Sequence, residues 1–192
     1  MKRFTSLAIA LAFPAVLAAQ QPAPAPVANP ITAAFKGRIT GMHRNIAQAF
    51  DSIPEAKFGY KPTPAQLSIG YIAQHVASDS YFFCDQFGAK KSGLPEKDTA
   101  TPDSVKATWP KDTLVAKLKA SFAYCQEAIG QLEDGKLADQ VTLTFGGKSR
   151  EVSRVTMVLG HALDLSDHYS QLANYMRLLG MLPPSALPRP KP

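Results

Sequence analysis

Apolar residues recur every three or four positions along four long stretches, and this spacing restricts the fold more than any other feature. One face of an α-helix returns with that period. The pattern predicts helices over residues 30–50, 67–87, 112–132 and 152–179. Four amphipathic helices in one domain of this size most simply form an all-α, four-helix bundle. The first apolar stripe consists of Ile31, Phe35, Ile39, Met42, Ile46 and Phe50.

The expected helix ends carry typical capping residues. Ser68, Asp112 and Ser153 are expected as N-caps, because their side-chain oxygens can accept a hydrogen bond from the first turn. Gly180 is expected to end the last helix, because glycine adopts the left-handed conformation there at little cost.

The connections between the helices differ in length and character. Residues 88–110 form a long linker, expected to hold one short helical turn near residues 104–109. The segment VTLTFGGKSREV alternates apolar and polar residues on both sides of Gly146-Gly147, which predicts a small hairpin before the last helix. Connections of these lengths allow a crossover as well as an up-down-up-down arrangement.

The N-terminus has the layout of a secretory signal peptide. Lys2 and Arg3 precede an apolar run from Leu7 to Leu17, and small residues follow it. We expect a signal peptide over residues 1–19 and a Pro/Ala-rich linker over 20–28. The folded domain would cover residues 29–184, and residues 185–192 would be a disordered tail. The protein would then be exported, periplasmic or secreted, without a stable membrane anchor after cleavage; the alternative is an uncleaved N-terminal anchor.

The charge of the chain does not indicate a nucleic-acid partner. The formal net charge is +6 and falls to +4 without Lys2 and Arg3. The remaining basic residues are scattered and are not interleaved with aromatic side chains, so no nucleic-acid partner is expected.

Two cysteines, Cys84 and Cys125, lie in the second and third predicted helices. Export exposes a protein to oxidising conditions, so we expect the two to form a disulfide. The alternative is two separate buried thiols. Neither cysteine has the basic neighbours expected of a nucleophilic thiolate.

Histidines and aspartates at helical spacing suggest a metal site. Asp164 lies four residues before His168, and His75 lies four residues before Asp79, so each pair shares one helix face. If the two helices pack against each other, His75, Asp164 and His168 could bind one ion, with Asp79 as a further ligand. Two imidazoles and a carboxylate suit Zn, Ni, Fe(II) or Mn, and water on such an ion would be the reactive group.

Less specific explanations also fit these residues. Asp164 and His168 can form a plain ion pair, and His75 can be a satisfied polar group on a helix. His161 lies two turns from His168, so we expect it to support the site or the core rather than share the same ion. No nucleophile elbow, phosphate loop or dinucleotide fingerprint occurs in the sequence.

Two segments resemble a known family. KPTPAQLSIGYIAQHVA (residues 61–77) and HALDLSDHYSQLANYMRLLGMLPP (residues 161–184) are similar to the signature regions of the DinB/YfiT-like superfamily of metal-dependent four-helix bundles. The resemblance maps the family's metal triad onto His75, position 164 and His168. The chain departs from the family at position 164, where Asp replaces the usual His. Asp164 would either act as a carboxylate ligand or break the triad.

The resemblance also implies a range of functions. Relatives include transferases that use low-molecular-weight thiols and a thiol-dependent maleylpyruvate isomerase, and subunits in the family often pair, which implies a homodimer. An exported protein would not meet such thiols at high concentration, so we do not carry the thiol-dependent transferase activity over. The expected function is a divalent-metal protein with hydrolase or transferase activity on a small molecule. The alternative is a metal-free binding or stress-related bundle with a structural His/Asp network.

Overall fold

The computed structural model describes residues 27–88, 94, 96–145 and 147–188. The expected signal peptide, most of the linker and the end of the tail (residues 1–26 and 189–192) lie outside the described residues. The described chain is mostly helical and contains one small antiparallel sheet. The expected all-α class is therefore confirmed at the level of a predominantly helical chain with a hairpin before the last helix.

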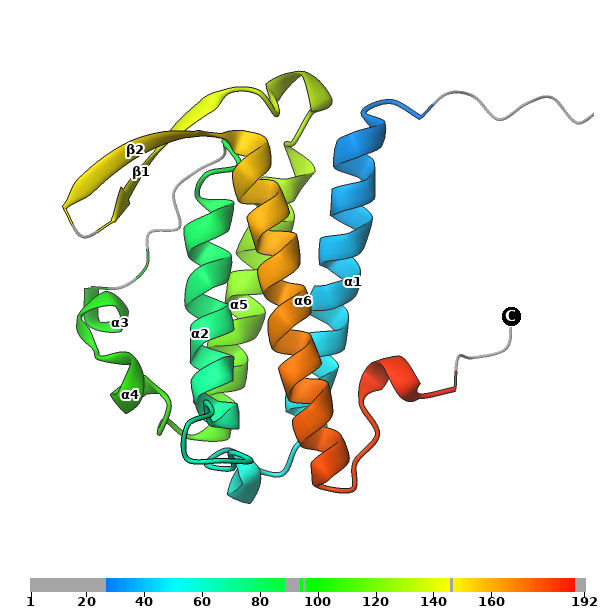
Figure 1. Cartoon of the computed structure of the whole chain (residues 1–192), viewed down its shortest axis with the longest axis vertical. Coiled ribbons are helices and arrows are strands. Elements are labelled where there is room, and N and C mark those ends of the chain that lie inside the picture. Colours follow the sequence, from blue (N-terminus) through cyan, green and yellow to red (C-terminus); the bar gives the residue numbers. More distant parts are fainter. Residues whose placement is uncertain (1–26, 89–93, 95, 146, 189–192) are drawn as a thin grey trace, which may run out of the picture.

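Four long helices lie side by side around a single core (Figure 1). They are α1 (Pro30–Ser52), α2 (Ile69–Cys84), α5 (Lys111–Gly130) and α6 (Arg154–Leu178). Helix α2 packs against α5 and α6, and α1 packs against the same two helices. In Figure 1, α1 and α6 run in one direction and α2 and α5 in the other. The arrangement therefore places α2 next to an antiparallel α6.

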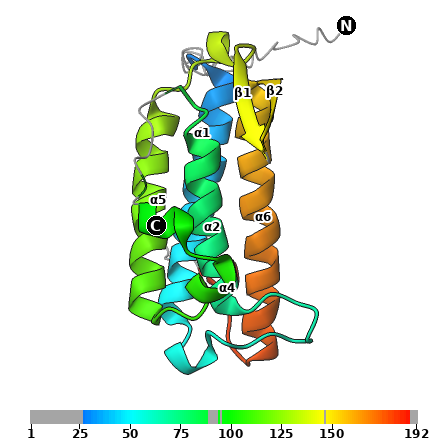
Figure 2. The ribbon, with the colours of Figure 1, turned by 90° about the vertical axis from the view of Figure 1, so that its left-hand side faces the viewer.

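A long crossover joins the two parallel helices α2 and α5. It contains two short helices, α3 (Glu96–Ala100) and α4 (Asp103–Lys106), where the sequence predicted one turn. The remaining short elements are the 3-10 turns η1 (Glu55–Lys57), η2 (Asp134–Lys136) and η3 (Pro184–Ala186). In Figure 2, α4 of the crossover and the hairpin both lie on the side that faces the viewer.

The predicted hairpin is present. Strand β1 (Gln140–Phe145) pairs antiparallel with β2 (Lys148–Ser153), with Phe145 opposite Lys148. The turn between them contains Gly147 with φ 75°, a left-handed conformation that favours glycine. The hairpin ends directly at the start of α6, so it fixes where that helix begins.

The predicted helix caps are only partly correct. The Ser68 side chain accepts a hydrogen bond from Tyr71 N at 3.1 Å, as expected of an N-cap. Ser153 occupies the N-cap position of α6 but makes no capping bond there, since its hydroxyl contacts the Thr156 hydroxyl. Asp112 is not a cap, because α5 starts one residue earlier, after Pro110. Its carboxylate lies in the first turn, where its negative charge interacts favourably with the positive end of the helix dipole.

Gly180 ends α6 as predicted. Its φ is 75°, its N–H donates to Arg177 O, and Met181 N donates to Met176 O at 2.8 Å. This pair of bonds is the Schellman arrangement, which satisfies carbonyls that have no partner within the helix. The chain then turns through η3, where Ser185 N donates to the Tyr169 hydroxyl at 2.8 Å. The predicted disordered tail thus begins with a turn that contacts α6.

A distant carboxylate caps α1. Asp134 accepts hydrogen bonds from Ile31 N at 3.1 Å and Thr32 N at 2.8 Å, across about a hundred residues of sequence. Ile31 was predicted to join the apolar stripe, but its side chain is 53% exposed. The reason is that Ile31 lies in the first turn, beyond the end of the core. The other five residues of that stripe are buried or packed against the core.

The core fills the space between the four long helices with aliphatic and aromatic side chains from each of them. No described helix combines the length and the hydropathy needed to cross a membrane. The largest fully buried side chains are Phe50, Phe87, Ile39, Ile46, Ile53, Ile69, Ile72, Leu114, Leu118, Ile129, Leu132 and Leu165.

Glycine at position 70 lets the start of α2 approach the crossover closely. A β-carbon there would collide with the backbone carbonyl oxygen of Ala107. Gly70→Ala is therefore expected to lower the free energy of unfolding by about 1–3 kcal/mol, as overpacking does. Gly37→Ala, at an exposed position on α1 with open space around it, is expected to raise it by up to about 1 kcal/mol. Urea unfolding of both variants checks this, and equal effects would contradict the close approach.

Candidate metal centre

Helices α2 and α6 bring the four predicted polar residues together. His75 and Asp79 lie one turn apart on α2, and Asp164 and His168 lie one turn apart on α6. One potential ligand atom from each of the four lies within 4.8 Å of the others. The His75 and His168 rings meet edge to face, with their centroids 4.8 Å apart. The structure therefore brings the two His/Asp faces together.

Each helix also pairs its own histidine and aspartate. His75 Nε2 lies 3.3 Å from Asp79 Oδ2, and His168 Nε2 lies 3.3 Å from Asp164 Oδ1. The α6 side is the more buried, with 8% of the His168 side chain and 18% of Asp164 exposed. On α2, 31% of His75 and 26% of Asp79 are exposed. The cluster is thus closed towards α6 and open to solvent towards α2.

Two atoms of the cluster are buried without a hydrogen-bond partner among the described residues. They are Asp164 Oδ2 and His168 Nδ1. A buried polar atom without a partner is unfavourable and rare in folded proteins. A cation would use the free carboxylate oxygen, and the set of two imidazoles and two carboxylates matches the ligands of Zn²⁺, Mn²⁺, Fe²⁺ and Ni²⁺. The residues present therefore fit a divalent transition metal, and Asp164 supplies an oxygen where the family usually has an imidazole.

Burial and neighbouring charges shift the pKa values of two groups in this cluster. Burial raises the pKa of Asp79 to about 6, although the neighbouring His75 opposes this and Asp164 adds to it. Burial lowers the pKa of His168, but the hydrogen bond and charge of Asp164 outweigh it, so the net pKa is raised. Protons and a metal ion would compete for the same groups, as expected of a metal site.

His161 lies apart from this cluster, as its spacing predicted. It is fully buried, and its Nε2 lies 3.3 Å from Cys125 Sγ. Burial lowers the pKa of His161 to about 3, with a further contribution from His43. Burial also lowers the pKa of His43 to about 3. The two rings are therefore neutral at neutral pH and form a second buried cluster with Cys125.

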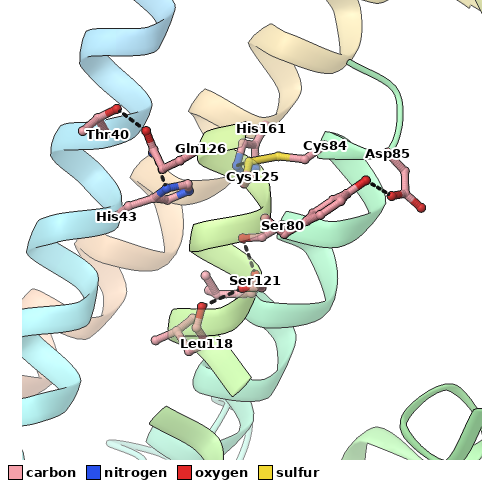
Figure 3. The surroundings of a disulfide bond; sticks show 12 residues. Thr40, His43, Ser80, Cys84, Asp85, Leu118, Ser121, Cys125, Gln126 and His161 are labelled. Atoms are coloured by element: carbon pink, nitrogen blue, oxygen red, sulfur yellow. Dashed lines mark hydrogen bonds between the residues drawn. A yellow bond between two sulfur atoms is a disulfide. The ribbon is translucent and has the colours of Figure 1, made fainter. Parts of the chain in front are cut away.

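The two cysteines lie at the centre of this second cluster. The sulfur atoms of Cys84 on α2 and Cys125 on α5 lie at disulfide-bonding distance, and their α-carbons are 5.3 Å apart (Figure 3). Both side chains are fully buried. Helices α2 and α5 are therefore neighbours, as a disulfide between them requires.

His43 on α1 was not predicted from the sequence as a member of this cluster. Its ring stacks on Phe122 with centroids 4.0 Å apart, and its Nδ1 lies 2.9 Å from Gln126 Nε2. One signal was available: His43 follows Ile39 by four positions and precedes Ile46 by three, which places it on the apolar face of α1. A histidine on that face is buried, and a buried histidine needs a partner.

Comparisons with known proteins agree on the family. The model of the DinB superfamily matches residues 38–172. No curated protein matches this chain. A solved DinB-like protein from Bacillus cereus is 17% identical, with a TM-score of 0.61, and the match covers 81% of this chain and 97% of that one. A conserved protein from Enterococcus faecalis is also 17% identical, with a TM-score of 0.59 and coverages of 78% and 98%.

A third structure similar to this chain is a mycothiol-dependent maleylpyruvate isomerase. It is 16% identical, with a TM-score of 0.58, and the match covers 73% of this chain and 60% of that one. At such identities the solved structures show a shared fold only. The family match extends over most of the described helical core, including His75, Asp164 and His168. The chain belongs to the DinB superfamily.

Proposed function

We propose that this protein is an exported member of the DinB superfamily, a four-helix bundle that binds one divalent transition metal through His75, Asp164 and His168. The observation that carries the proposal is the convergence of four ligand atoms within 4.8 Å, together with the buried Asp164 oxygen, for which the described part of the chain offers no partner. Asp79 is the further ligand or the group that hydrogen-bonds to one. The N-terminal pattern of Lys2, Arg3 and the following apolar run supports export.

The arrangement supports hydrolase or transferase chemistry on a small molecule. A bound divalent ion would supply Lewis acidity at this place. The α6 residues hold the buried side of the site, and the partly exposed His75 and Asp79 leave the other side accessible. Asp79, whose pKa burial raises to about 6, can take up or release a proton near neutral pH.

Two surfaces support a small-molecule ligand and a homodimer. A cavity of about 270 Å³ lies along the neighbouring face of α2, lined by Gln74 and Ser78 among others. Ile31, Leu159 and Leu163 form an exposed apolar strip along α1 and α6, where 53%, 46% and 61% of their surfaces are accessible. Such a strip favours pairing of two copies.

A metal-free binding bundle is the second candidate function. It is favoured by the two His–Asp pairs, since each helix already pairs its own charges at 3.3 Å. In that case the His/Asp cluster would be a structural hydrogen-bond network that stabilises the fold.

Metal analysis of untagged protein is expected to distinguish the two functions. We expect about one equivalent of transition metal after dialysis against Zn²⁺ or Mn²⁺ and removal of the excess. His168→Ala and Asp164→Ala are expected to lose it, whereas Asp164→His, which restores the family's usual ligand, should keep it. Metal at a hundred times its dissociation constant should stabilise the wild type by about 2.7 kcal/mol and His168→Ala by nothing.

Asp167→Asn is the matched control, because Asp167 is exposed on the same helix and its carboxylate bonds to Gln171 instead. This variant should bind metal as the wild type does. Less than about a tenth of an equivalent in the wild type, with no gain in melting temperature, would remove the metal function. Strong destabilisation of His168→Ala regardless of metal would then support the structural network.

A further inference from the structure

A second cluster of potential metal ligands lies around the cysteine pair, in the core between all four long helices. His43 comes from α1, Cys84 from α2, Cys125 from α5 and His161 from α6. Ligand atoms of His43, Cys125 and His161 lie within 4.8 Å of one another. The Cys84 sulfur lies at bonding distance from that of Cys125, so it borders this group of three (Figure 3).

The two histidines of this cluster are buried in the core without a charge. His43 is 5% exposed and His161 is fully buried, and both are uncharged at neutral pH. Nε2 of His43 has no hydrogen-bond partner among the described residues, whereas Nε2 of His161 is the ring nitrogen that faces the cysteine pair, 3.3 Å from Cys125 Sγ. A neutral, buried imidazole with a free nitrogen is the form in which histidine binds metals.

A hydrogen-bond chain orients the His43 ring. The Thr40 hydroxyl donates to Gln126 Oε1 at 2.9 Å, and the Gln126 amide lies 2.9 Å from His43 Nδ1. Because the Thr40 hydroxyl can donate or accept, the Gln126 amide can present either its nitrogen or its oxygen to the ring. When the oxygen faces the ring, Nδ1–H donates to it and the lone pair of Nε2 is free. Ligating histidines are commonly fixed by such a bond on the other ring nitrogen.

We propose that reduction of the Cys84–Cys125 pair turns this cluster into a zinc site made of His43, Cys84, Cys125 and His161. Two thiolates and two imidazoles are a ligand set that Zn²⁺ takes in closed, tetrahedral sites. The oxidised pair cannot bind the ion in this way, because the thiolate is the metal ligand. The cluster is therefore a redox-dependent zinc site, distinct in residues and chemistry from the His/Asp cluster.

The redox step balances with a dithiol as reductant. The dithiol passes two electrons and two protons to the pair and becomes a disulfide itself, and the Cys84–Cys125 bond is replaced by two thiols. Zn²⁺ then binds both sulfurs, and the two thiol protons are released to solvent.

Cobalt and zinc binding to the whole purified protein tests the proposal. The protein is reduced with dithiothreitol, freed of it by desalting under argon, and compared with untreated protein. We expect the reduced protein to bind one more equivalent of Zn²⁺ than the oxidised protein. With Co²⁺ it should also show a near-ultraviolet thiolate-to-cobalt absorption band, which the sulfur-free His/Asp cluster cannot produce.

Matched variants separate the two sites. The double variant Cys84→Ser, Cys125→Ser should bind no additional zinc and show no band, and reduced His161→Gln should lose the additional equivalent. His75→Ala should keep the additional equivalent and the band while losing the metal of the oxidised protein. Failure of the His/Asp proposal would thus remove the metal of the oxidised protein and leave the additional equivalent gained on reduction unchanged.

The proposal is overturned if reduced, folded protein binds no more zinc than oxidised protein and shows no band. Circular dichroism checks the fold after reduction. If reduction unfolds the chain, Zn²⁺ is expected to restore the helical signal, and failure to restore it also overturns the proposal.

Discussion

Reduction of the Cys84–Cys125 pair is expected to lower the free energy of unfolding by about 4 kcal/mol. The pair would close a loop with a sequence separation of 41 residues. A link of that span removes loop entropy from the unfolded chain, which on the chain-entropy account is worth about 4 kcal/mol. Both cysteines are fully buried, so the loss of the link adds no new exposed surface in the folded state. Urea unfolding of oxidised and reduced protein, both with a chelator present, measures the difference.

The double variant Cys84→Ser, Cys125→Ser provides the control for the reductant. It should unfold at the same lower urea concentration with and without dithiothreitol, whereas the wild type should shift only when reduced. Two free thiols in denatured, unreduced protein, or coincident unfolding curves for the two redox states, would contradict the link.

The helices could be predicted from the sequence because their apolar spacing is long and regular. Local chemistry also placed the Ser68 cap and the Gly180 stop correctly. The Asp134 cap of α1 could not be predicted, because it depends on a contact between segments about a hundred residues apart. The exposure of Ile31 was not visible in its spacing either, because spacing gives the face of a helix but not where the core ends along it.

The His/Asp cluster could be predicted because each half lies within one helical turn and the family resemblance joined the two halves. The second cluster could not, since its four residues come from four helices at single positions. Their meeting depends on how far each helix is rotated about its own axis. Spacing gives the face of one helix but not the depth at which two faces meet.

Acid is expected to destabilise the oxidised, metal-free protein before its carboxylates are fully protonated. Burial holds the pKa values of His43 and His161 at about 3, below their ordinary value of 6.5. As the pH falls, both imidazole rings are therefore protonated in the unfolded chain at a higher pH than in the folded chain. The stability that depends on the neutral rings is fully present above about pH 6.5 and is lost as the pH falls towards 3.

Asp79 acts in the opposite direction over part of this range. Its pKa is raised from 3.8 to about 6, so the folded chain takes up that proton first between these pH values. The lowered pKa values of Asp103 and Asp134 act only below about 3.8, and the raised pKa of His168 acts above 6.5. Between pH 6 and 4 the unfolded chain thus binds about one proton more than the folded chain. Stability should fall by about 1.4 kcal/mol per pH unit.

Two substitutions should change this slope in opposite directions. His161→Gln removes one of the two imidazoles that bind a proton in the unfolded chain but not in the folded chain. The slope should therefore fall to near zero. Asp79→Asn removes the opposing proton, so the slope should rise to about 2.7 kcal/mol per pH unit. Ser121→Ala, at a fully buried position on α5 that does not titrate, should lower stability at every pH and leave the slope unchanged. Urea unfolding at several pH values between 6 and 4 measures all four slopes, and a wild-type slope that His161→Gln leaves unchanged would contradict a neutral, buried His161.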